Sequence, residues 1–540
     1  MCGILFIHSQ NVSNIQTEDV QGILKKRGPD AQSIVSIDDK ALFEFNRLKI
    51  KDSSDNAMQP FQDGKTWSMC NGEIFNWEEL VKKFNLKLST SCDCEVIIAL
   101  FKLFLTEGLS PAHATRKICE ELDGEFAFVI YHQEMDTEFT IAARDPYGVR
   151  PLFIGDLKDD GGICFASEMK GIHGLCSSIE QFQPGSFLVD AHSSALGFRT
   201  NQQVYRQQFP VKYTILDENS ALQAINSSLK AAVKKRLMSD KEICCLLSGG
   251  LDSSLIAGLV SAHFEPRTLK TYSIGLVGSP DLHHAKLVAD HIKSDHTTIE
   301  LSQEEFLDAI ETVIYTIESY DTTSVRASVG NYLVSKYIKD NSDCKVVFNG
   351  DYADEVCGGY KYFSRCQDGE EFHNECVRLT SDIHYFDSLR SDRCISSNGL
   401  EGRVPYADKD FVQMYLSIAP ELRMSNERIE KFLLRKAFDH EDLIPAEVLW
   451  RKKEAFSDGV STVENSWHKI IKSYADQHVS DDDHQKMKND IINPAVSKET
   501  ALYKTIFKKF YDFDSIIPYY WLPKFCGEMN GEPSARELSS

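Results

Sequence analysis

The chain has 540 residues, which is too long for one hydrophobic core and predicts two or three domains. It carries 81 acidic and 59 basic residues, and its net charge of -22 argues against binding to a nucleic-acid backbone or an anionic membrane surface, because both need a basic face. The start of the chain lacks a basic stretch followed by an apolar one, and no stretch is apolar for long enough to cross a bilayer. We therefore expect a cytoplasmic protein without membrane or nucleic-acid partners.

The chain contains 15 cysteines, an odd number, which argues against a disulfide framework in a protein of this size. The close pairs of cysteines and histidines lack the spacing or the partners of a zinc site: Cys92 with Cys94, Cys244 with Cys245, and His283 with His284. We expect reduced, mostly buried thiols and no structural zinc.

The chain begins with Met1, Cys2 and Gly3, followed by an apolar run. Removal of Met1, which a small second residue permits, would place a thiol and a free α-amino group on Cys2. An α-amino group has a pKa of about 7.7 to 8.0 and can accept the thiol proton near neutral pH. Cys2 is therefore a candidate nucleophile. The alternative is an ordinary cysteine ahead of a buried strand.

The first part of the chain contains short runs rich in Phe, Ile and Val. They predict β-strands at residues 3–8, 68–71, 126–131 and 139–143, with a helix at 95–105. Strands joined by hairpins, with a helix packed on them, fit an α/β sandwich of antiparallel sheets. A connector at residues 199–217, poor in apolar side chains, then precedes a region of helical periodicity. We expect domains at 1–205 and 206–525.

The second region alternates strands and helices as a doubly wound parallel sheet does: strands at 243–247, 268–275 and 297–301, and helices at 253–263 and 282–292. Ligands bind such sheets beyond the carboxyl ends of the strands. Near the end of the chain, the acidic stretch 480–484 predicts a loop, and the polar residues 526–540 predict a disordered tail.

The strand at 243–247 leads directly into a turn of small and hydroxyl-bearing residues at 248–254. Gly249 and Gly250 have no Cβ, so backbone N–H groups and serine hydroxyls can converge on an anion at the start of a helix. A carboxylate at Asp252 would repel phosphates unless a divalent cation lay between them, so the turn predicts a nucleotide with Mg²⁺. The lysine of the Walker loop is missing, and an ordinary strand-helix turn would look similar.

Residues 1–520 resemble the glutamine-hydrolysing asparagine synthetases. In the first half the resemblance is to a class II glutamine amidotransferase domain and rests on residues 2–3, 27–30, 46–48, 71–76, 93–97, 122–124 and 143–146. In the second half it is to the synthetase domain and rests on residues 248–254, 318–321, 325–328, 358–360, 401–405, 450–454 and 456–460. The resemblance implies an N-terminal Ntn-hydrolase-like antiparallel α/β sandwich, then a doubly wound parallel α/β synthetase domain with extra helices.

The resemblance implies a glutamine site around Cys2. Cys2 would be the nucleophile, and the Asn71 side chain and the Gly72 N–H would form the oxyanion hole. Arg47 would bind the substrate carboxylate, and Asp93 with Glu73 its ammonium group. The residues implied to bind glutamine are Arg47, Leu48, Lys49, Ile50, Lys51, Asn71, Gly72, Glu73 and Asp93. Without the resemblance, Arg47 and Asp93 would be read as an exposed ion pair.

Two residues depart from the family pattern in this half. Lys26 stands where the family often has His, and Lys49 replaces a small polar residue. Both lie next to the implied glutamine site and bear on the shape of its pocket.

The resemblance also implies that ATP, as a substrate, activates aspartate to β-aspartyl-AMP with release of pyrophosphate, and that ammonia then displaces AMP. The residues implied to bind ATP are Leu246, Ser248, Gly249, Gly250, Asp252, Ser253, Ile274, Asn349 and Gly350. Asp252 and Asp354 would hold Mg²⁺, and Lys453 would meet the developing phosphate charge. Arg326 and Tyr360 would lie near the aspartate or the phosphates.

The strongest departure from the family lies at residues 349–355, where Asp351 replaces a glutamate and Tyr352 a glycine. In the family, that glutamate is associated with formation of the aspartyl-adenylate and with handling of the ammonia proton. The Asp351 side chain is one methylene shorter than the glutamate. Tyr352 adds a large ring to a turn of close backbone approach, so we expect crowding there.

Two other functions compete with an asparagine synthetase that acts on glutamine, aspartate and ATP. A relative could adenylate another carboxylate, as β-lactam-forming synthetases do, but those commonly lack the N-terminal cysteine. A pseudo-enzyme could bind nucleotide without amidating aspartate, and the altered turn at Asp351 favours that alternative. The sequence leaves the oligomeric state open, with a homodimer as one candidate.

Overall fold

The computed structural model describes residues 1–525 except 18–19, 159–160, 193–201, 207–208, 211, 265–267, 426, 454–458 and 462–465. The chain forms two compact units, the first of Met1–Gln208 with Met238–Lys241 and the second of Phe209–Leu237 with Glu242–Ser540. The predicted tail at 526–540 lies outside the described residues, and so does part of the predicted connector at 199–217.

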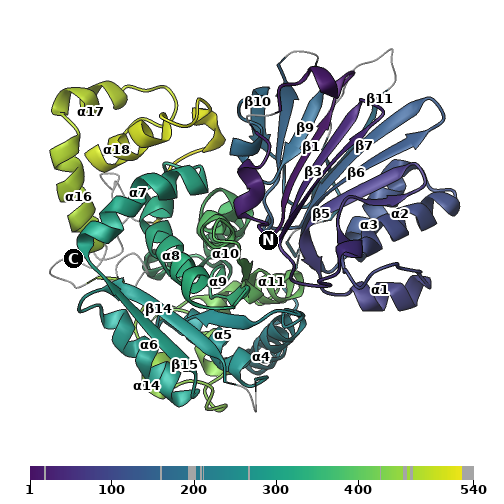
Figure 1. The fold of residues 1–540 in the computed structure, drawn as a ribbon. Helices are drawn as coiled ribbons and strands as arrows, with labels where there is room; N and C mark the ends of the chain where they lie inside the picture. Colours follow the sequence, from purple (N-terminus) through teal and green to yellow (C-terminus); the bar gives the residue numbers. More distant parts are fainter. Residues whose placement is uncertain are drawn as a thin grey trace. The chain divides into compact units, whose positions relative to one another are not determined.

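The first unit contains two six-stranded sheets, and every strand pairing in them is antiparallel (Figure 1). In order across the first sheet, the strands are β10 (Cys176–Gln181), β8 (Phe153–Leu157), β9 (Ile163–Ala166), β1 (Gly3–His8), β3 (Ala41–Arg47) and β2 (Ala31–Ile37). Across the second they are β12 (Gln203–Val204), β11 (Ser186–His192), β7 (Thr137–Arg144), β6 (Gly124–Glu134), β5 (Thr66–Ile74) and β4 (Phe61–Asp63). The helices are α1 (Trp77–Phe84), α2 (Glu95–Thr106) and α3 (Pro111–Glu121).

Two hydrophobic clusters give this unit its layers. One joins the facing sides of the sheets, with Phe6, Phe43 and Val129 among its members. The other joins the second sheet to α2 and α3, with Phe101 and Ile118 among its members. Apolar area removed from water on both faces of the second sheet stabilises the sandwich. The predicted α/β sandwich of antiparallel sheets is confirmed.

The second unit is built on a five-stranded parallel sheet. In order, its strands are β15 (Asp295–Leu301), β14 (Lys270–Leu276), β13 (Ile243–Leu246), β16 (Val346–Phe348) and β17 (Glu401–Arg403). In chain order, α5 (Leu251–Ser261) follows β13, and α6 (Pro280–His291) follows β14. Helices α7 (Gln303–Ile317) and α8 (Thr322–Asn341) then lie between β15 and β16. The predicted parallel sheet is confirmed, and it has helices packed on β13, β14 and β15.

The extra helices of this unit are α4 (Glu218–Lys235), α9 (Ala353–Cys357), α10 (Gly369–Asp382), α11 (Lys409–Leu416), α12 (Pro420–Arg423), α13 (Phe432–Ala437), α14 (Ala446–Leu449), α16 (Trp467–His478), α17 (Asp481–Met487) and α18 (Lys498–Phe507). Helix α17 shows that the predicted loop at 480–484 is wrong. The Ser480 side chain caps this helix by accepting from the Asp483 N–H, and three aspartates occupy the first turn, where the helix dipole favours negative charge.

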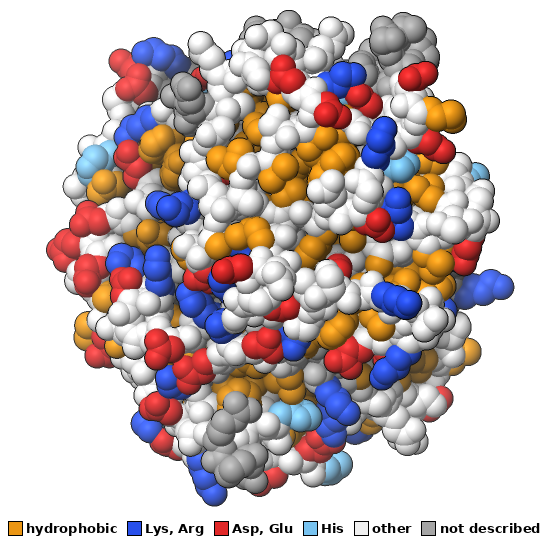
Figure 2. Space-filling view, turned by 45° about the vertical axis from the view of Figure 1, so that its right-hand side comes forward, with side chains coloured by type: hydrophobic (Ala, Val, Ile, Leu, Met, Phe, Trp, Pro, Cys, Tyr) orange, Lys and Arg blue, Asp and Glu red, His pale blue; other side chains and the backbone are white. Residues whose placement is uncertain are grey.

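Charged side chains of both signs are interspersed over the face drawn in Figure 2. Within the described ranges, every helix is too short or too polar to span a bilayer.

Candidate active sites

A cavity in the second unit lies at the carboxyl ends of β13, β14 and β16. Most of the residues that the sequence predicted for the nucleotide and its chemistry line this cavity: Leu246, Ser248, Gly250, Asp252, Ser253, Ile274, Asn349, Gly350, Asp351, Asp354, Tyr360 and Lys453. Segments more than 200 residues apart in the chain therefore meet at one sheet edge, as expected for ligand sites of parallel sheets.

The turn after β13 is held by its own hydroxyls. The Ser248 and Ser253 oxygens are 2.9 Å apart, and the Ser248 N–H donates to Ser253 Oγ at 3.1 Å. Gly249 has a φ of +73°, and a Cβ there would lie 2.5 Å from the Ala285 nitrogen. A Cβ on Gly350 would lie 2.5 Å from the Ser253 nitrogen, so the turns after β13 and β16 touch backbone to backbone.

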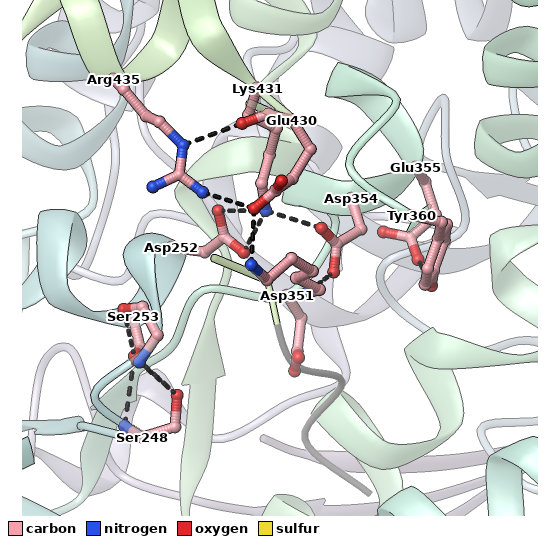
Figure 3. A network of polar contacts seen from close by, with 12 residues as sticks. Ser248, Asp252, Ser253, Asp351, Asp354, Glu355, Tyr360, Glu430, Lys431 and Arg435 are labelled. Carbon is pink, nitrogen blue, oxygen red and sulfur yellow. Dashed lines mark hydrogen bonds and ion pairs between the residues drawn. The ribbon is translucent and has the colours of Figure 1, made fainter. Parts of the chain in front are cut away.

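Lys431 lies between the two carboxylates predicted to hold Mg²⁺ (Figure 3). Its Nζ is 2.6 Å and 2.7 Å from the two Asp252 oxygens and 2.6 Å from Asp354 Oδ1. Lys453 Nζ contacts the other Asp354 oxygen. Glu430 accepts from the Lys453 N–H at 2.6 Å and from Arg435 at 2.7 Å, and so fixes the segments that carry both lysines.

This cluster keeps its charges although it is buried. Burial opposes ionisation of Asp354, but Lys431 and Lys453 outweigh it and hold the Asp354 pKa well below its ordinary value. Burial likewise opposes the Lys431 cation, but Asp252 and Asp354 outweigh it and raise the Lys431 pKa above its ordinary value. The cavity therefore presents fixed charges of both signs to a ligand.

Asp351 is the most unusual carboxyl group in the cavity. Burial raises its pKa to about 6, with Arg390 acting in the opposite direction. Arg390 lies 2.9 Å from Asp351 Oδ1, whereas Asp351 Oδ2 has no hydrogen-bond partner among the residues that the structure describes. A buried carboxylate oxygen without a partner is costly unless a ligand completes it.

Tyr352 does not crowd the cavity, so that expectation is wrong. Its backbone takes the left-handed conformation, with a φ of 75°, which suits the glycine of the family better than a tyrosine. The ring is buried outside the cavity lining, and its hydroxyl lies 2.5 Å from Ser388 Oγ, two residues before Arg390. This contact links the Asp351 turn to the segment that supplies its arginine.

Arg326 does not line the cavity. It forms a two-pronged ion pair with Glu499, at 2.8 Å and 2.6 Å, and both side chains are buried. Tyr360 does line the cavity, and its hydroxyl donates to Glu355. Tyr360 is thus at the cavity, whereas Arg326 belongs to a buried ion pair and does not line it.

Replacing Arg326 by methionine is expected to destabilise the fold by about 3–5 kcal/mol, because Glu499 would be left buried without its partner. Thermal unfolding measures this loss. The double variant Arg326→Met with Glu499→Leu should recover most of the stability and keep the parental KM values for ATP and aspartate. A raised KM in the double variant would show instead that Arg326 contacts a substrate.

The predicted glutamine site of the first unit begins where β1 pairs with β3. Gly3 is opposite Asn46 in that pairing, which places Cys2 beside Arg47. The Cys2 carbonyl accepts from Arg27 Nε at 3.0 Å, and Arg27 in turn pairs with Glu168 at 2.6 Å. Cys2 is partly exposed, whereas Met1 is only 1% exposed. Removal of Met1 would therefore open space directly beside the thiol.

Asn71 is a buried residue of this predicted site with an unpartnered side-chain amide among the described residues. It lies on β5 with 0% exposure, and neither its amide nitrogen nor its amide oxygen has a hydrogen-bond partner within the described parts of the chain. A Cβ on the neighbouring Gly72 would lie 2.3 Å from the Glu125 carbonyl oxygen, so β6 approaches the backbone closely there. Buried amides are normally bonded, so Asn71 is poised for a ligand atom.

The other predicted glutamine residues fall into two groups. Arg47 donates to the Ser54 carbonyl at 2.6 Å and to the Asp52 carbonyl, and Asp93 accepts from the Ile74 N–H at 2.6 Å. Both are buried and fixed, as is Glu73, which is buried on β5. Leu48 and Ile50 are buried, whereas Lys49 and Lys51 point to Asp55 and Asp240, so these lysines could meet glutamine only through their backbone.

Several cavity residues of the second unit were not predicted: Asp387, Arg390, Lys431, Arg435 and Arg451. Arg451 lies in the stretch 450–454, which was used for prediction, whereas the other four lie outside those stretches, on segments without a glycine-rich turn or a paired motif. Only the tertiary structure brings these side chains to the cavity.

Comparison with known proteins finds a matching family model for each half of the chain. The family model described as "Glutamine amidotransferase domain" matches residues 1–207, and the "Asparagine synthase" model matches residues 224–371 and 364–515. The chain is 37% identical to a "Probable asparagine synthetase [glutamine-hydrolyzing]" of Acanthamoeba polyphaga mimivirus, over the full length of both. It is also 37% identical to the asparagine synthetases of Gallus gallus and Homo sapiens, over 100% of this chain and 98% and 99% of theirs. With both family models and full-length relatives at this identity, the chain belongs to the glutamine-hydrolysing asparagine synthetases.

Proposed function

We propose that this chain makes asparagine from aspartate, with ATP as the activating substrate and glutamine as the nitrogen donor. The observation that carries the proposal is the cavity in which Asp252, Asp354, Lys431 and Lys453 meet the serine-glycine turn at the edge of a parallel sheet. Fixed charges of both signs suit a reaction that moves phosphate charge.

In the first unit, we propose that the Cys2 thiol loses its proton to the α-amino group and attacks the amide carbon of glutamine. The Asn71 amide and the Gly72 N–H would stabilise the oxyanion, Arg47 would bind the substrate carboxylate, and Asp93 its ammonium group. Ammonia leaves, and water then cleaves the thioester to release glutamate. The unpartnered Asn71 amide supports this assignment.

In the second unit, an oxygen of the aspartate side chain would attack the α-phosphorus of ATP, and pyrophosphate would leave. Ammonia would then attack the acyl carbon, and AMP would leave with the bond electrons. Lys453, which contacts Asp354, would meet the phosphate charge, and Lys431 pairs with both carboxylates. Asn349 and Gly350 line the cavity and would offer their backbone to the nucleotide.

The two carboxylates also fit Mg²⁺. Asp252 and Asp354 face the same cavity and offer only oxygen donors, which is the ligand type that Mg²⁺ prefers. Bound Mg²⁺ would offset the negative charge of the phosphates. Asp252 and Asp354 would hold the ion, with Lys431 keeping both side chains in position.

Asp351 would take the place of the family's glutamate in accepting a proton from the attacking ammonia. Replacing Asp351 by asparagine should slow ammonia-dependent synthesis on the order of 10² or more, the usual contribution of a positioned proton acceptor. Because the pKa of Asp351 is about 6, the parental rate should fall as the pH drops below about 6 and the carboxylate takes up a proton. Rates measured from about pH 5 to about pH 8, on both sides of that pKa, test this.

The asparagine variant should lose that pH dependence, since an amide does not titrate in this range. A variant with the parental rate and an unchanged pH profile would rule out a proton-transfer role for Asp351.

The decisive test of the function is asparagine formation by the purified chain with ATP, Mg²⁺ and aspartate, using glutamine and ammonia in parallel. Asparagine from both nitrogen sources is the expected result. Pyrophosphate release that does not depend on aspartate would instead point to another carboxylate or to a pseudo-enzyme. Light scattering on the same sample decides whether the chain forms a homodimer.

A further inference from the structure

Two cysteines flank the carboxylate of Asp93 at the start of α2. Cys92 Sγ lies 3.9 Å from Asp93 Oδ1, and Cys94 Sγ lies 3.7 Å from Asp93 Oδ2. The three ligand atoms, one per residue, all lie within 4.8 Å of one another. The residues are 7%, 2% and 3% exposed, so this is an interior cluster and not a group of surface side chains.

A third thiol extends the cluster from the neighbouring sheet. Cys70 lies on β5 and is 1% exposed, and its thiol is close enough to the Cys94 thiol for each to shift the pKa of the other. Cys94 Sγ also lies 3.5 Å from the carbonyl oxygen of Gly72, the residue whose N–H is assigned to the oxyanion hole. The cluster therefore adjoins the glutamine site through two residues, Asp93 and Gly72.

The local fold explains why a Cys-Asp-Cys sequence converges in this way. The turn that opens α2 is closed by hydrogen bonds from the Glu95 N–H to the Cys92 carbonyl and from the Val96 N–H to the Asp93 carbonyl. The Ile74 N–H fixes Asp93 Oδ2 from the sheet side. Considered alone, the spacing of Cys92 and Cys94 did not suggest metal ligands; Asp93 and Cys70 complete the set.

We propose that Cys92, Asp93 and Cys94, with Cys70 as a fourth donor, form a binding site for one thiophilic metal ion such as Zn²⁺, and that the bound ion inhibits glutamine hydrolysis. Inhibition would follow because the ion occupies the carboxylate that the substrate ammonium needs. This second part rests on the role of Asp93 in the proposed function. Synthesis from free ammonia does not use Asp93 and should continue.

The chemistry of the cluster suits such an ion. Zn²⁺ binds thiolates at about 2.3 Å and carboxylate oxygens at about 2.0–2.2 Å in a tetrahedral site, so the ligand atoms need to approach one another only slightly. Each thiol that binds gives up its proton to the buffer. The neighbouring thiols and burial raise the pKa of Cys92 and Cys94 well above the ordinary value.

Metal binding is tested on the full-length chain, reduced with a phosphine because dithiol reductants bind Zn²⁺. Calorimetric titration with Zn²⁺, and visible absorption after addition of Co²⁺, should show one site with thiolate coordination. The variant with Cys92→Ala and Cys94→Ala should lose that site. The matched control, with Cys164→Ala and Cys176→Ala, removes two buried thiols that lie 2.9 Å apart elsewhere in the same unit, and it should keep the site.

Equal Zn²⁺ binding by the parent and the Cys92/Cys94 variant would overturn the proposal. So would loss of the site in Cys2→Ala, because the ion would then lie on the catalytic thiol. If the double variant does not fold, the single variants Cys92→Ser and Cys94→Ser, checked by circular dichroism, decide the same question.

Inhibition is tested at the Zn²⁺ concentration that fills the site. Glutaminase activity of the parent should fall at least tenfold, while ammonia-dependent synthesis stays within twofold of its metal-free rate. The Cys92/Cys94 variant should keep its glutaminase activity at that concentration. Bound Zn²⁺ without inhibition would overturn the regulatory part, whereas the proposed function is judged separately from the metal-free activities.

Discussion

Replacing Cys2 by alanine is expected to abolish asparagine synthesis from glutamine and to leave synthesis from ammonia at the parental rate. The variant lacks the nucleophile of the first unit, whereas the cavity of the second unit contains no residue from that site. Asparagine formation is measured with each nitrogen source under the same conditions. The ratio of the glutamine-dependent rate to the ammonia-dependent rate should fall to zero in the variant. Glutamate release should fall to the rate seen without protein.

A matched control is Cys119→Ala, which removes a buried thiol of α3 in the same unit and should keep both activities. Equal loss of both activities in Cys2→Ala would contradict two separate sites. Intact-mass analysis adds a second check, because a retained Met1 would lock the Cys2 amine in a peptide bond and leave the thiol without its proton acceptor.

Replacing Asp252 by asparagine is expected to reduce synthesis from either nitrogen source on the order of 10²–10³, the range found when one charge-stabilising group is lost. A neutral amide is a poorer ligand for Mg²⁺, and Lys431 would lose one of its two oxygen contacts with this residue together with the negative charge that it pairs with. Pyrophosphate release with ATP and aspartate, measured over a range of Mg²⁺ concentrations, tests this. Glutaminase activity should persist.

The control for this variant is Asp290→Asn on α6, where the exposed carboxylate pairs with Lys286, four residues earlier in the same helix. Such exposed pairs contribute at most about 1 kcal/mol, so its activities should match the parent. An Asp252→Asn chain that works at the parental rate at every Mg²⁺ concentration would mean that Asp252 holds no metal.

Structure could be predicted from the sequence where neighbouring residues in one segment determine the strand or turn that they form. Strand β1 has the predicted bounds, Gly3–His8, and the turn at 248–254 joins a strand to a helix as its glycines and serines indicated. The acidic stretch after Ser480 is the instructive failure. A run of aspartates suggested a loop, but a serine cap followed by acidic residues is also what the first turn of a helix prefers.

The sequence by itself determined the family, the two kinds of fold and the residues of its recognisable turns, because those depend on neighbours in the chain. Only the tertiary structure decided that Lys431 forms ion pairs with both Asp252 and Asp354 and that Arg326 forms one with Glu499. It also decided that the Cys70 thiol lies near Cys94, beside Asp93. These contacts join residues that are between 24 and 179 positions apart. Which distant charges and thiols share a buried space depends on packing, which no local pattern encodes.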